Sequence, residues 1–228
     1  MHKLFGLSMN NQWVQLFLEL NIPFYIYKLN KGDSIIYKCK NKNSSAAIIL
    51  HGTVYILKMF TNAEGVCIAI LNYNNIIDFH FSTLEKDYVY YKVIALEETY
   101  LINFYWWDFI SVFNYLPIAI KILYLFRNTL KKYEMISYVI SHKSIRYRFI
   151  QLLVLLCQEF GTVNNHSIKI PFEVSQTTIS RIIGSNTITV NKIMRDLISQ
   201  LLIKYIVKKK TLICYFALLT YLRNNKIN

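Results

Sequence analysis

Hydrophobic residues recur at helical spacing in two stretches near the C-terminal end of the chain, separated by a single break at residues 184–186. The apolar positions of the first stretch are Ile179, Ile182 and Ile183. Ser175 precedes them and can accept hydrogen bonds from the free N–H groups of a helix start. Gly184 can adopt the left-handed conformation that ends a helix. The pattern therefore predicts a short helix over 175–183.

A second helix is predicted after Asn186, a residue type that often caps a helix start. The residues expected on its buried face are Ile193, Leu197 and Leu201. The residues expected to stay polar are Thr187, Thr189, Asn191, Lys192 and Arg195. Two short helices joined by a tight turn form a helix-turn-helix, and a second helix with one basic face suits a DNA groove. The alternative is a helical hairpin whose polar face is only solvated.

Two strand-like runs, 202–207 and 211–216, follow the second helix and flank the lysines 208–210. A two-stranded ribbon in this place is the wing of a winged helix. Between residues 175 and 210, seven lysines and arginines stand against one acid, Asp196, so the local charge is +6. Such a patch neutralises DNA phosphates and releases counterions, which favours a DNA-binding domain over a plain hairpin.

The first hundred residues contain short apolar runs punctuated by glycines, a pattern typical of β-structure. The runs are 35–37, 47–50, 54–57 and 66–71, and the glycines are Gly32, Gly52 and Gly65. A small barrel or roll is the expected product.

The segment 99–120 has a single charge, Asp108, and can also be interpreted as a membrane span. Asn103, Asp108 and Asn114 would leave polar groups unsatisfied in lipid. We therefore expect a strand of alternating residues that turns into a helix at Pro117, and no membrane partner.

From Leu116 onward, a stripe of mostly apolar positions alternates steps of three and four residues, as in a coiled coil. The stripe consists of Leu116, Ala119, Leu123, Phe126, Leu130, Tyr133, Ser137 and Ile140. A helix of this kind can pair with a copy of itself. Two DNA-binding domains that each bind one half-site of a palindrome are related by a two-fold axis. The alternative is a helix that packs on its own domain.

Composition changes this interpretation little. The net charge of +13 and the pI near 9.5 agree with a nucleic-acid or anionic-surface partner. The chain is also rich in residues with A/T-rich codons, so mutational bias can supply part of that charge, and the local patch is the better evidence. The four cysteines, Cys39, Cys67, Cys157 and Cys214, lie far apart in sequence, and no cleavable leader is evident. We expect reduced, buried thiols in a cytosol-like compartment.

Catalysis is the rival class of function, because β-rolls also carry metal-dependent enzymes. The five histidines are His2, His51, His80, His142 and His166. They form no H-x-H or H-x-x-x-H pair, and no two glycines are close enough for a phosphate loop. We expect no enzyme activity and no metal site.

The order of these parts resembles the Crp/Fnr family of transcription regulators along essentially the whole chain, and most closely its nitrogen-control branch. The resemblance rests on K-G-D-S-I at 31–35, L-H-G-T-V at 50–54, E-M-I at 134–136, L-L-V-L-L-C-Q-E-F-G at 152–161, I-G-S-N-T-I-T-V at 183–190 and K-K-K-T-L at 208–212. It implies an α+β fold with an N-terminal cyclic-nucleotide-binding-like β-roll (jelly roll). The implied divisions are the β-roll over 1–115, a dimerisation helix over 116–142, a winged helix-turn-helix over 143–218 and a tail over 219–228.

The resemblance also implies a homodimer that binds a palindromic promoter site in double-stranded DNA and recruits or blocks RNA polymerase. The residues implied to face DNA are Ser175, Gln176, Thr187, Ile188, Thr189, Asn191, Lys192, Arg195, Lys208, Lys209 and Lys210. Where the family usually has arginines that contact guanine, this chain has Thr187 and Lys192, so we expect altered or relaxed base preference. The expected targets are nitrogen-related promoters. The alternative is a non-specific or effector-independent remnant of such a regulator.

Effector binding is expected to differ from that of the relatives. No phosphate cradle is visible at 75–80, so we do not expect cyclic AMP. The positions related to the 2-oxoglutarate site of the nitrogen branch are Ile77, Asp78, Phe79, His80, Tyr88, Arg127 and Glu134. Asp78 stands at a glycine position and Tyr88 and Thr129 at arginine positions, and only Glu134 matches. We expect weak, altered or absent 2-oxoglutarate binding, and no iron–sulfur cluster because the cysteines are not clustered.

The same A/T-rich composition, taken with the resemblance to cyanobacterial regulators, suggests a plastid-encoded copy in a red alga. The expected location is therefore the chloroplast stroma, or otherwise a bacterial cytoplasm.

Overall fold

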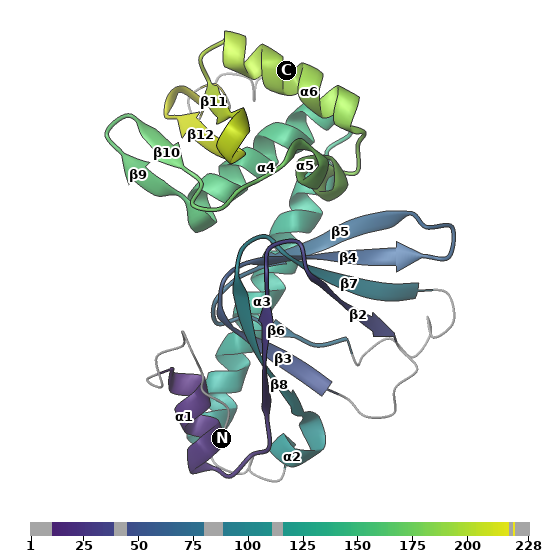
Figure 1. Ribbon diagram of the computed structural model, residues 1–228, viewed down its shortest axis with the longest axis vertical. Helices are drawn as coiled ribbons and strands as arrows, with labels where there is room; N and C mark the ends of the chain where they lie inside the picture. Colours follow the sequence, from purple (N-terminus) through teal and green to yellow (C-terminus); the bar gives the residue numbers. More distant parts are fainter. Residues whose placement is uncertain (1–10, 39–44, 80–88, 111–115, 219–220, 222–228) are drawn as a thin grey trace. The chain divides into compact units, whose positions relative to one another are not determined.

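The computed structural model describes residues 11–38, 45–79, 89–110, 116–218 and 221. The chain forms two compact units, one from residues 1–63 and 70–132 and the other from 64–69 and 133–228 (Figure 1). The elements up to the long helix are α1 (Gln12–Glu19), β1 (Tyr25–Leu29), β2 (Ser34–Lys38), β3 (Ser45–His51), β4 (Val54–Phe60), β5 (Gly65–Leu71), β6 (Ile76–Ile77), β7 (Val89–Ala95), β8 (Thr99–Tyr105), α2 (Trp106–Ile110) and α3 (Leu116–Ser141).

The strands form two four-stranded sheets with the orders β1-β8-β3-β6 and β2-β7-β4-β5. The pairs β1–β8, β3–β8, β2–β7 and β4–β7 are all antiparallel, with Tyr25 opposite Asn103 and Val54 opposite Ala95. Gly52 turns β3 into β4 with φ +87°, and a Cβ there would lie 2.4 Å from Thr99 Oγ1. Only glycine fits this turn, because both the backbone angle and the space exclude a side chain. The predicted β-roll is confirmed.

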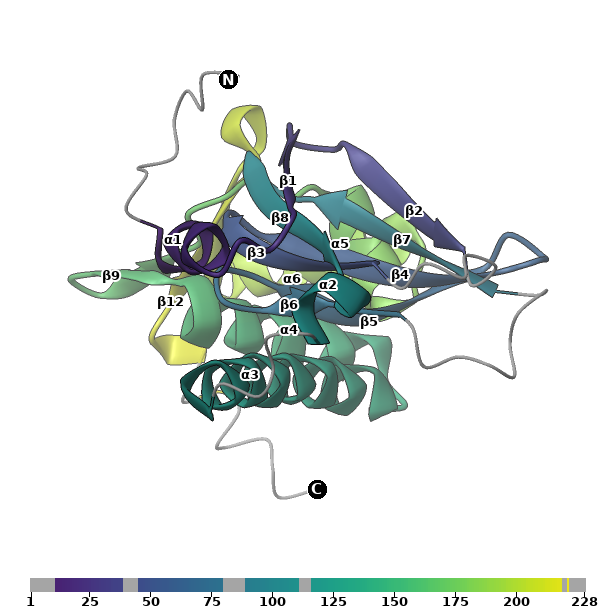
Figure 2. The same ribbon diagram turned by 90° about the horizontal axis from the view of Figure 1, so that it is seen from below.

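One hydrophobic core lies on the β1-β8-β3-β6 sheet, which is covered by α1, α2 and the first half of α3 (Figure 2). Phe17 of α1, Phe104 of β8 and Phe109 of α2 are fully buried, and their ring centroids lie 5.1–5.7 Å apart. Asn11 caps α1 by accepting a hydrogen bond from the Trp13 backbone N–H at 3.0 Å. The sequence pattern had predicted neither α1 nor α2.

The segment 99–120 forms a strand, the short helix α2 and the start of α3, with Pro117 as the second residue of α3. The strand was predicted, but the alternation was wrong: the first four residues of β8 are all buried, because the strand lies in the interior of the roll with both faces covered. None of the helices in the described ranges combines the length and hydropathy that crossing a bilayer needs.

The 26-residue helix α3 buries a stripe that differs from the predicted seam. The buried residues are Ile118, Ile122, Leu125, Thr129, Lys132, Ile136 and Val139. On the seam, Leu123 and Leu130 are 63% and 67% exposed, whereas the Phe126 ring stacks on Trp106 at 5.9 Å. The helix thus packs against the rest of the chain through one face. Of the predicted seam, Leu123, Leu130 and Ser137 are exposed, and Ala119, Phe126, Tyr133 and Ile140 are half-buried. The side chain of Leu116 lies outside the described residues.

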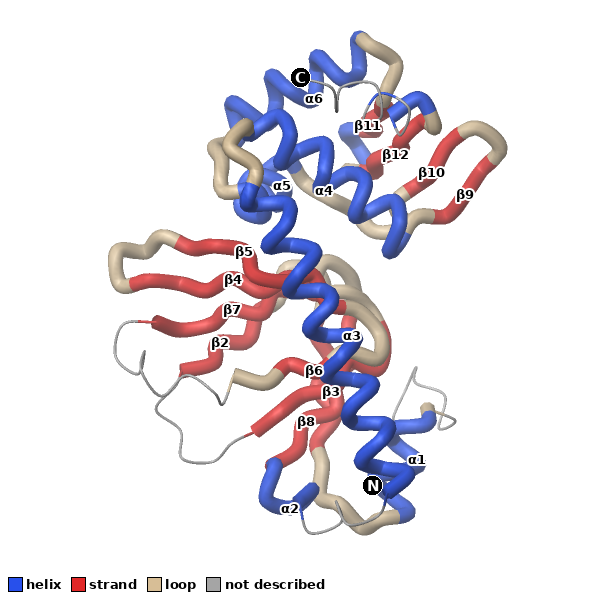
Figure 3. The backbone as a smooth tube through the Cα atoms, turned by 180° about the vertical axis from the view of Figure 1, so that it is seen from behind, coloured by secondary structure: helices blue, strands red, loops and turns tan. Residues whose placement is uncertain are grey.

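The second unit contains the last part of α3, and its described residues after α3 form α-helices and a small sheet (Figure 3). The elements are α4 (Ile145–Phe160), β9 (Thr162–Asn164), β10 (Ser167–Lys169), α5 (Gln176–Ile183), α6 (Thr187–Ser199), β11 (Ile203–Ile206), the 3-10 turn η1 (Val207–Lys209) and β12 (Thr211–Tyr215). The strand order is β11-β12-β10-β9. The β9–β10 hairpin was not predicted, because its strands have only three residues each and a single apolar residue each.

Cys67, Cys157 and Cys214 are free thiols and buried, in agreement with the sequence expectation, and Cys39 lies outside the described residues. Burial raises the pKa of the Cys67 thiol to about 12. The protonated thiol donates a hydrogen bond to the Ala69 carbonyl at 3.6 Å. Cys157 and Cys214 share a hydrogen bond that, with burial, raises the pKa of Cys214. The structure therefore pairs two cysteines that are 57 positions apart in sequence.

Cys67 should make folding less stable at alkaline pH. In the unfolded chain the thiol ionises near its ordinary pKa of 9.0, whereas in the folded chain it stays protonated up to about pH 12. The contribution of the protonated thiol to the stability of the fold is therefore complete below pH 9 and is lost as the pH rises toward 12. Between pH 8 and pH 11, the free energy of unfolding measured in urea should fall by up to about 3 kcal/mol more for the native chain than for Cys67→Ala. Equal losses in the two chains would contradict this assignment.

Candidate nucleic-acid interface

The first helix of the interface, α5, has the ends that its sequence predicts. The Ser175 hydroxyl accepts a hydrogen bond from the Thr178 backbone N–H at 2.9 Å and so caps the start. Gly184 ends the helix at φ +64°, and the Ser185 N–H that follows donates to the Ser180 carbonyl at 2.9 Å. The apolar face is also confirmed, because Ile179, Ile182 and Ile183 are buried.

The second helix, α6, starts as predicted but ends earlier. The Asn186 side chain accepts a hydrogen bond from the Thr189 backbone N–H at 2.7 Å. The prediction of a buried Leu201 was wrong: α6 ends at Ser199, and Leu201 is 75% exposed with φ +56°. Leu202 takes the buried place, and its N–H donates to the Leu197 carbonyl at 3.0 Å. A left-handed residue at the helix end turns the chain, so the next side chain reaches the core.

The face of α6 that points away from its core combines an apolar start with two cations. The buried residues of α6 are Val190, Ile193, Met194 and Leu197. Ile188 is 81% exposed, and Lys192 and Arg195, one and two turns further on, are exposed on the same face. A helix surface of this kind can place an apolar group against base methyls and cations against phosphates or base edges.

The other residues expected to face DNA are less accessible. Thr187 and Thr189 are half-buried, and the Thr187 hydroxyl lies 3.5 Å from the Ser180 hydroxyl. Gln176 is half-buried, with its amide nitrogen 3.7 Å from the Met194 sulfur. Asn191 is half-buried, and its side-chain oxygen is enclosed without a hydrogen-bond partner within the described residues. The sequence pattern had kept Thr187, Thr189 and Asn191 on the polar side of the second helix, and the resemblance had assigned Gln176 to DNA.

The lysine-rich turn forms the tip of a wing beside α5. β11 and β12 pair antiparallel, with Ile206 opposite Thr211, and the lysines between them are exposed. Lys210 has a left-handed backbone at φ +45°, and its carbonyl accepts a hydrogen bond from the Val174 N–H at 2.9 Å. The Tyr205 hydroxyl donates to the Val174 carbonyl at 3.3 Å. These bonds hold the wing next to Ser175, the first residue of the helix-turn-helix.

All seven lysines and arginines of the patch are exposed: Arg181, Lys192, Arg195, Lys204, Lys208, Lys209 and Lys210. The single acid among them, Asp196, forms an ion pair with Arg146 of α4. The hydrogen bond to Asp196, and a second to the Tyr221 hydroxyl, raise the pKa of the Arg146 guanidinium. The carboxylate is thus paired with a cation from outside the patch, so the patch keeps its positive field.

The effector positions are only partly brought together. Ile77 is buried in β6, and the half-buried Asp78 accepts a hydrogen bond from the Trp106 indole N–H at 3.1 Å. The Phe79 ring stacks on Tyr91 with centroids 4.2 Å apart. His80 and Tyr88 lie outside the described residues.

On α3, the buried Thr129 hydroxyl accepts a hydrogen bond from the Ile76 backbone N–H at 2.9 Å. This residue, which stands where an arginine was expected, therefore serves the packing of β6 against α3. Arg127 and Glu134 are exposed. Glu134 lines a cavity of about 280 Å³ between α3 and α4, which Ile77, Asp78 and Phe79 do not line.

The fold and the basic interface together define a winged-helix protein with the architecture of the Crp/Fnr regulators. Among solved structures, a CooA mutant from Carboxydothermus hydrogenoformans matches with a TM-score of 0.71 at 16% identity, covering 95% of this chain and 93% of that one. The c-di-GMP responsive regulator CLP from Xanthomonas campestris matches with a TM-score of 0.68 at 13% identity, covering 88% and 97%. At such identities these likenesses establish the fold.

Curated proteins that are similar in sequence include members of the nitrogen-control branch. The HTH-type transcriptional regulator ycf28 of Porphyra purpurea is 28% identical over 89% of this chain and 84% of its own length. The global nitrogen regulator of Synechococcus elongatus is 22% identical over 84% of this chain and 88% of its own length. No family model matches the chain. The predicted resemblance to the Crp/Fnr regulators is confirmed: the chain is similar to transcription regulators of this type, with global nitrogen regulators among the relatives.

Proposed function

We propose that this chain is a homodimer that binds a palindromic site in double-stranded DNA and regulates transcription from it. The observation that carries the proposal is the exposed face of α6, with Ile188, Lys192 and Arg195, beside a lysine wing that is hydrogen-bonded to the start of the same helix-turn-helix. The recognition helix reads bases, and the wing supplies contacts to phosphates. RNA polymerase is the expected partner on the promoter.

The exposed seam of α3 supports the homodimer. Leu123 and Leu130 are large apolar residues two turns apart, and both are more than 60% exposed. Such a stripe on a long helix is stable when it pairs with the same stripe of a second copy about a two-fold axis. Each copy then presents one α6, and the two recognition helices read half-sites one helical turn apart.

Nitrogen-related promoters in a plastid are the proposed setting. The support is the printed names of the relatives, a red-algal ycf28 protein and cyanobacterial global nitrogen regulators. We propose no catalytic activity, because the named relatives are regulators.

Effector control is proposed to be weak or lost. The aromatic rings of Tyr37, Phe79 and Tyr91 pack on one another at the segment that follows β6, with Phe79 5.1 Å from Tyr37. Asp78 accepts a hydrogen bond from Trp106, and the Thr129 hydroxyl accepts one from the backbone of β6. A dicarboxylate needs paired cations, and Asp78 opposes it by charge. We therefore propose weak or absent 2-oxoglutarate binding, no cyclic AMP and no iron–sulfur cluster.

The test is selection of duplexes from a random pool with the purified full chain, at two salt concentrations and with or without 2-oxoglutarate. Enrichment of a palindrome with half-sites one turn apart, unchanged by 2-oxoglutarate, is the expected outcome. Uniform, salt-sensitive binding without an enriched sequence would favour the second candidate, a general DNA binder that has lost base specificity. A ligand-dependent gain would contradict the loss of effector control.

Ile188 should read a thymine methyl in each half-site. Replacing thymine by uracil removes only that methyl, so scanning the selected site with deoxyuridine should find one position where binding weakens about fivefold per half-site, as expected for about 1 kcal/mol. Ile188→Ala should abolish the difference between thymine and uracil at that position. Val163→Ala, on another exposed apolar residue of this unit, is the matched control and should leave the difference intact. A native chain indifferent to uracil throughout would exclude this contact.

A further inference from the structure

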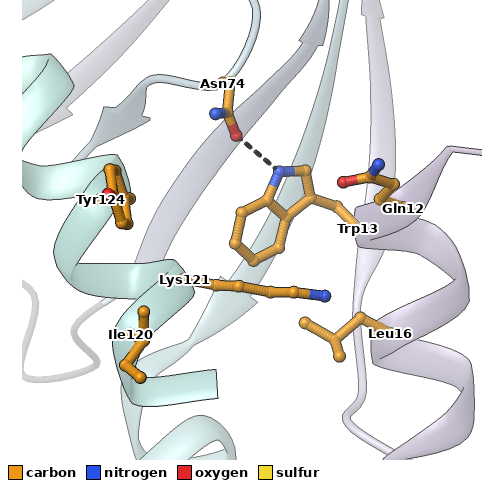
Figure 4. A pocket seen from close by; sticks show the side chains of 7 residues that line it. All are labelled: Gln12, Trp13, Leu16, Asn74, Ile120, Lys121 and Tyr124. Carbon is orange, nitrogen blue, oxygen red and sulfur yellow. Dashed lines mark hydrogen bonds between the residues drawn. The ribbon is translucent and has the colours of Figure 1, made fainter. Parts of the chain in front are cut away.

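A cavity of about 310 Å³ lies between α1 and the first turns of α3, within the first unit. It is separate from the residues assigned to DNA and from the segment that follows β6. The side chains of Trp13 and Leu16 approach it from α1, and those of Ile120, Lys121 and Tyr124 from α3 (Figure 4). Its volume falls at the small end of the range that holds organic ligands in proteins.

The wall from α1 is held in place. The Trp13 indole N–H donates to the Asn74 side-chain oxygen at 3.0 Å, and Trp13 is almost completely buried. Asn74 itself has a left-handed backbone at φ +63°, in the turn before β6. The indole ring thus has its polar atom satisfied and keeps an apolar face for the cavity. Pre-formed walls of this kind lower the ordering cost of binding.

A solvent-exposed cation, Lys121, borders this open cavity. Figure 4 shows the Lys121 side chain extending from α3 between Trp13 and Leu16. In the part of the chain that the structure describes, no carboxylate forms an ion pair with Lys121. The Gln12 side-chain amide lines the same cavity and adds a neutral donor. An ammonium beside tryptophan, leucine and isoleucine complements a molecule that is negative at one end and apolar in its body.

We infer that this cavity binds a small organic anion with one carboxylate on a flat apolar body. The carboxylate pairs with Lys121 and accepts from Gln12, and the body lies between Trp13 and Tyr124 above Leu16 and Ile120. The site remains accessible in the proposed homodimer, because Lys121 lies about 160–180° around α3 from Leu123 and Leu130. A ligand here would join α1 to the start of the helix that carries the dimer seam.

The probe is 2-naphthoate, with the neutral 2-naphthalenemethanol as its matched analogue, each titrated into the full chain by calorimetry. The indole N–H resonance of Trp13, assigned by its loss in Trp13→Phe, reports the location. We expect one naphthoate per chain, a shift of the Trp13 resonance, and about tenfold weaker binding of the alcohol.

Lys121→Met should weaken naphthoate about tenfold and leave the alcohol unchanged, whereas Leu16→Trp should fill the cavity and abolish both. Lys131→Met, which removes an exposed cation elsewhere on α3, is the control and should change nothing. Naphthoate binding that survives both Lys121→Met and Leu16→Trp, or that leaves the Trp13 resonance unmoved, would overturn the inference. No binding of either compound to the native chain would overturn it as well. None of these measurements involves DNA, so they stand apart from the proposed function.

Discussion

Replacing Leu123 and Leu130 together with arginine is expected to convert the chain from a dimer into a monomer and to weaken palindrome binding at least a hundredfold. Both side chains are mostly exposed within a single chain, so the substitution removes little internal packing. Across a two-fold axis, however, each arginine would meet its own copy, and like charges oppose association. A monomer binds one half-site only and loses the affinity that comes from holding two recognition helices in one molecule.

Sedimentation velocity gives the oligomeric state, and fluorescence anisotropy on the selected palindrome gives the affinity. Tyr124→Arg is the matched control, because Tyr124 is similarly exposed and lies about 100° around α3 from Leu123. It should leave the dimer intact. A double variant that remains dimeric and binds the palindrome normally would mean that the copies associate through another face.

Removing the charges of the wing should weaken binding to every duplex and flatten its dependence on salt. The variant combines Lys208→Ala and Lys209→Ala with Lys210→Asn, since asparagine tolerates the left-handed backbone of Lys210. If each lysine neutralises one phosphate, the slope of log K against log salt should become shallower by about 0.9 for each lysine and each half-site bound. At low salt the affinity should fall at least a hundredfold.

The control for the wing removes the same number of charges elsewhere, by Lys28→Ala, Lys121→Ala and Lys131→Ala. These lysines are exposed and belong to the first unit, and the ion pair that joins Lys28 to Glu98 is a surface pair of little energetic weight. The control should keep most of its affinity and its salt slope. The wing variant should prefer the same sequence as the native chain, because phosphate contacts carry no base information. A changed preference would show that the wing also reads bases.

How far the sequence predicts this protein depends on whether the determining interactions are local. Ser175, Gly184 and Asn186 cap and end their helices as predicted, because capping bonds span only three or four residues. The wing was likewise predictable from two apolar runs around three lysines. The strands of the roll were found because glycine positions such as Gly52 mark turns that no other residue can adopt.

The errors arise where spacing alone does not say where a helix ends or what covers a side chain. Leu201 has the right spacing for the buried face of α6, yet the helix stops two residues before it and Leu202 is buried instead. Asn191 lies on a polar stripe by spacing, yet its side-chain oxygen is buried without a hydrogen-bond partner among the described residues. Periodicity assigns a residue to a face but does not say what packs against that face.

The sequence by itself determined the order of parts, the helix-turn-helix with its basic wing and the resemblance to the Crp/Fnr regulators, because these rest on local spacing, capping residues and charge. Only the tertiary structure decided which stripe of α3 is buried, that Asp196 is paired with Arg146, and that Trp13 and Lys121 line one cavity. Each of these depends on elements separated by tens of residues, and a chain's local pattern does not specify such long-range packing.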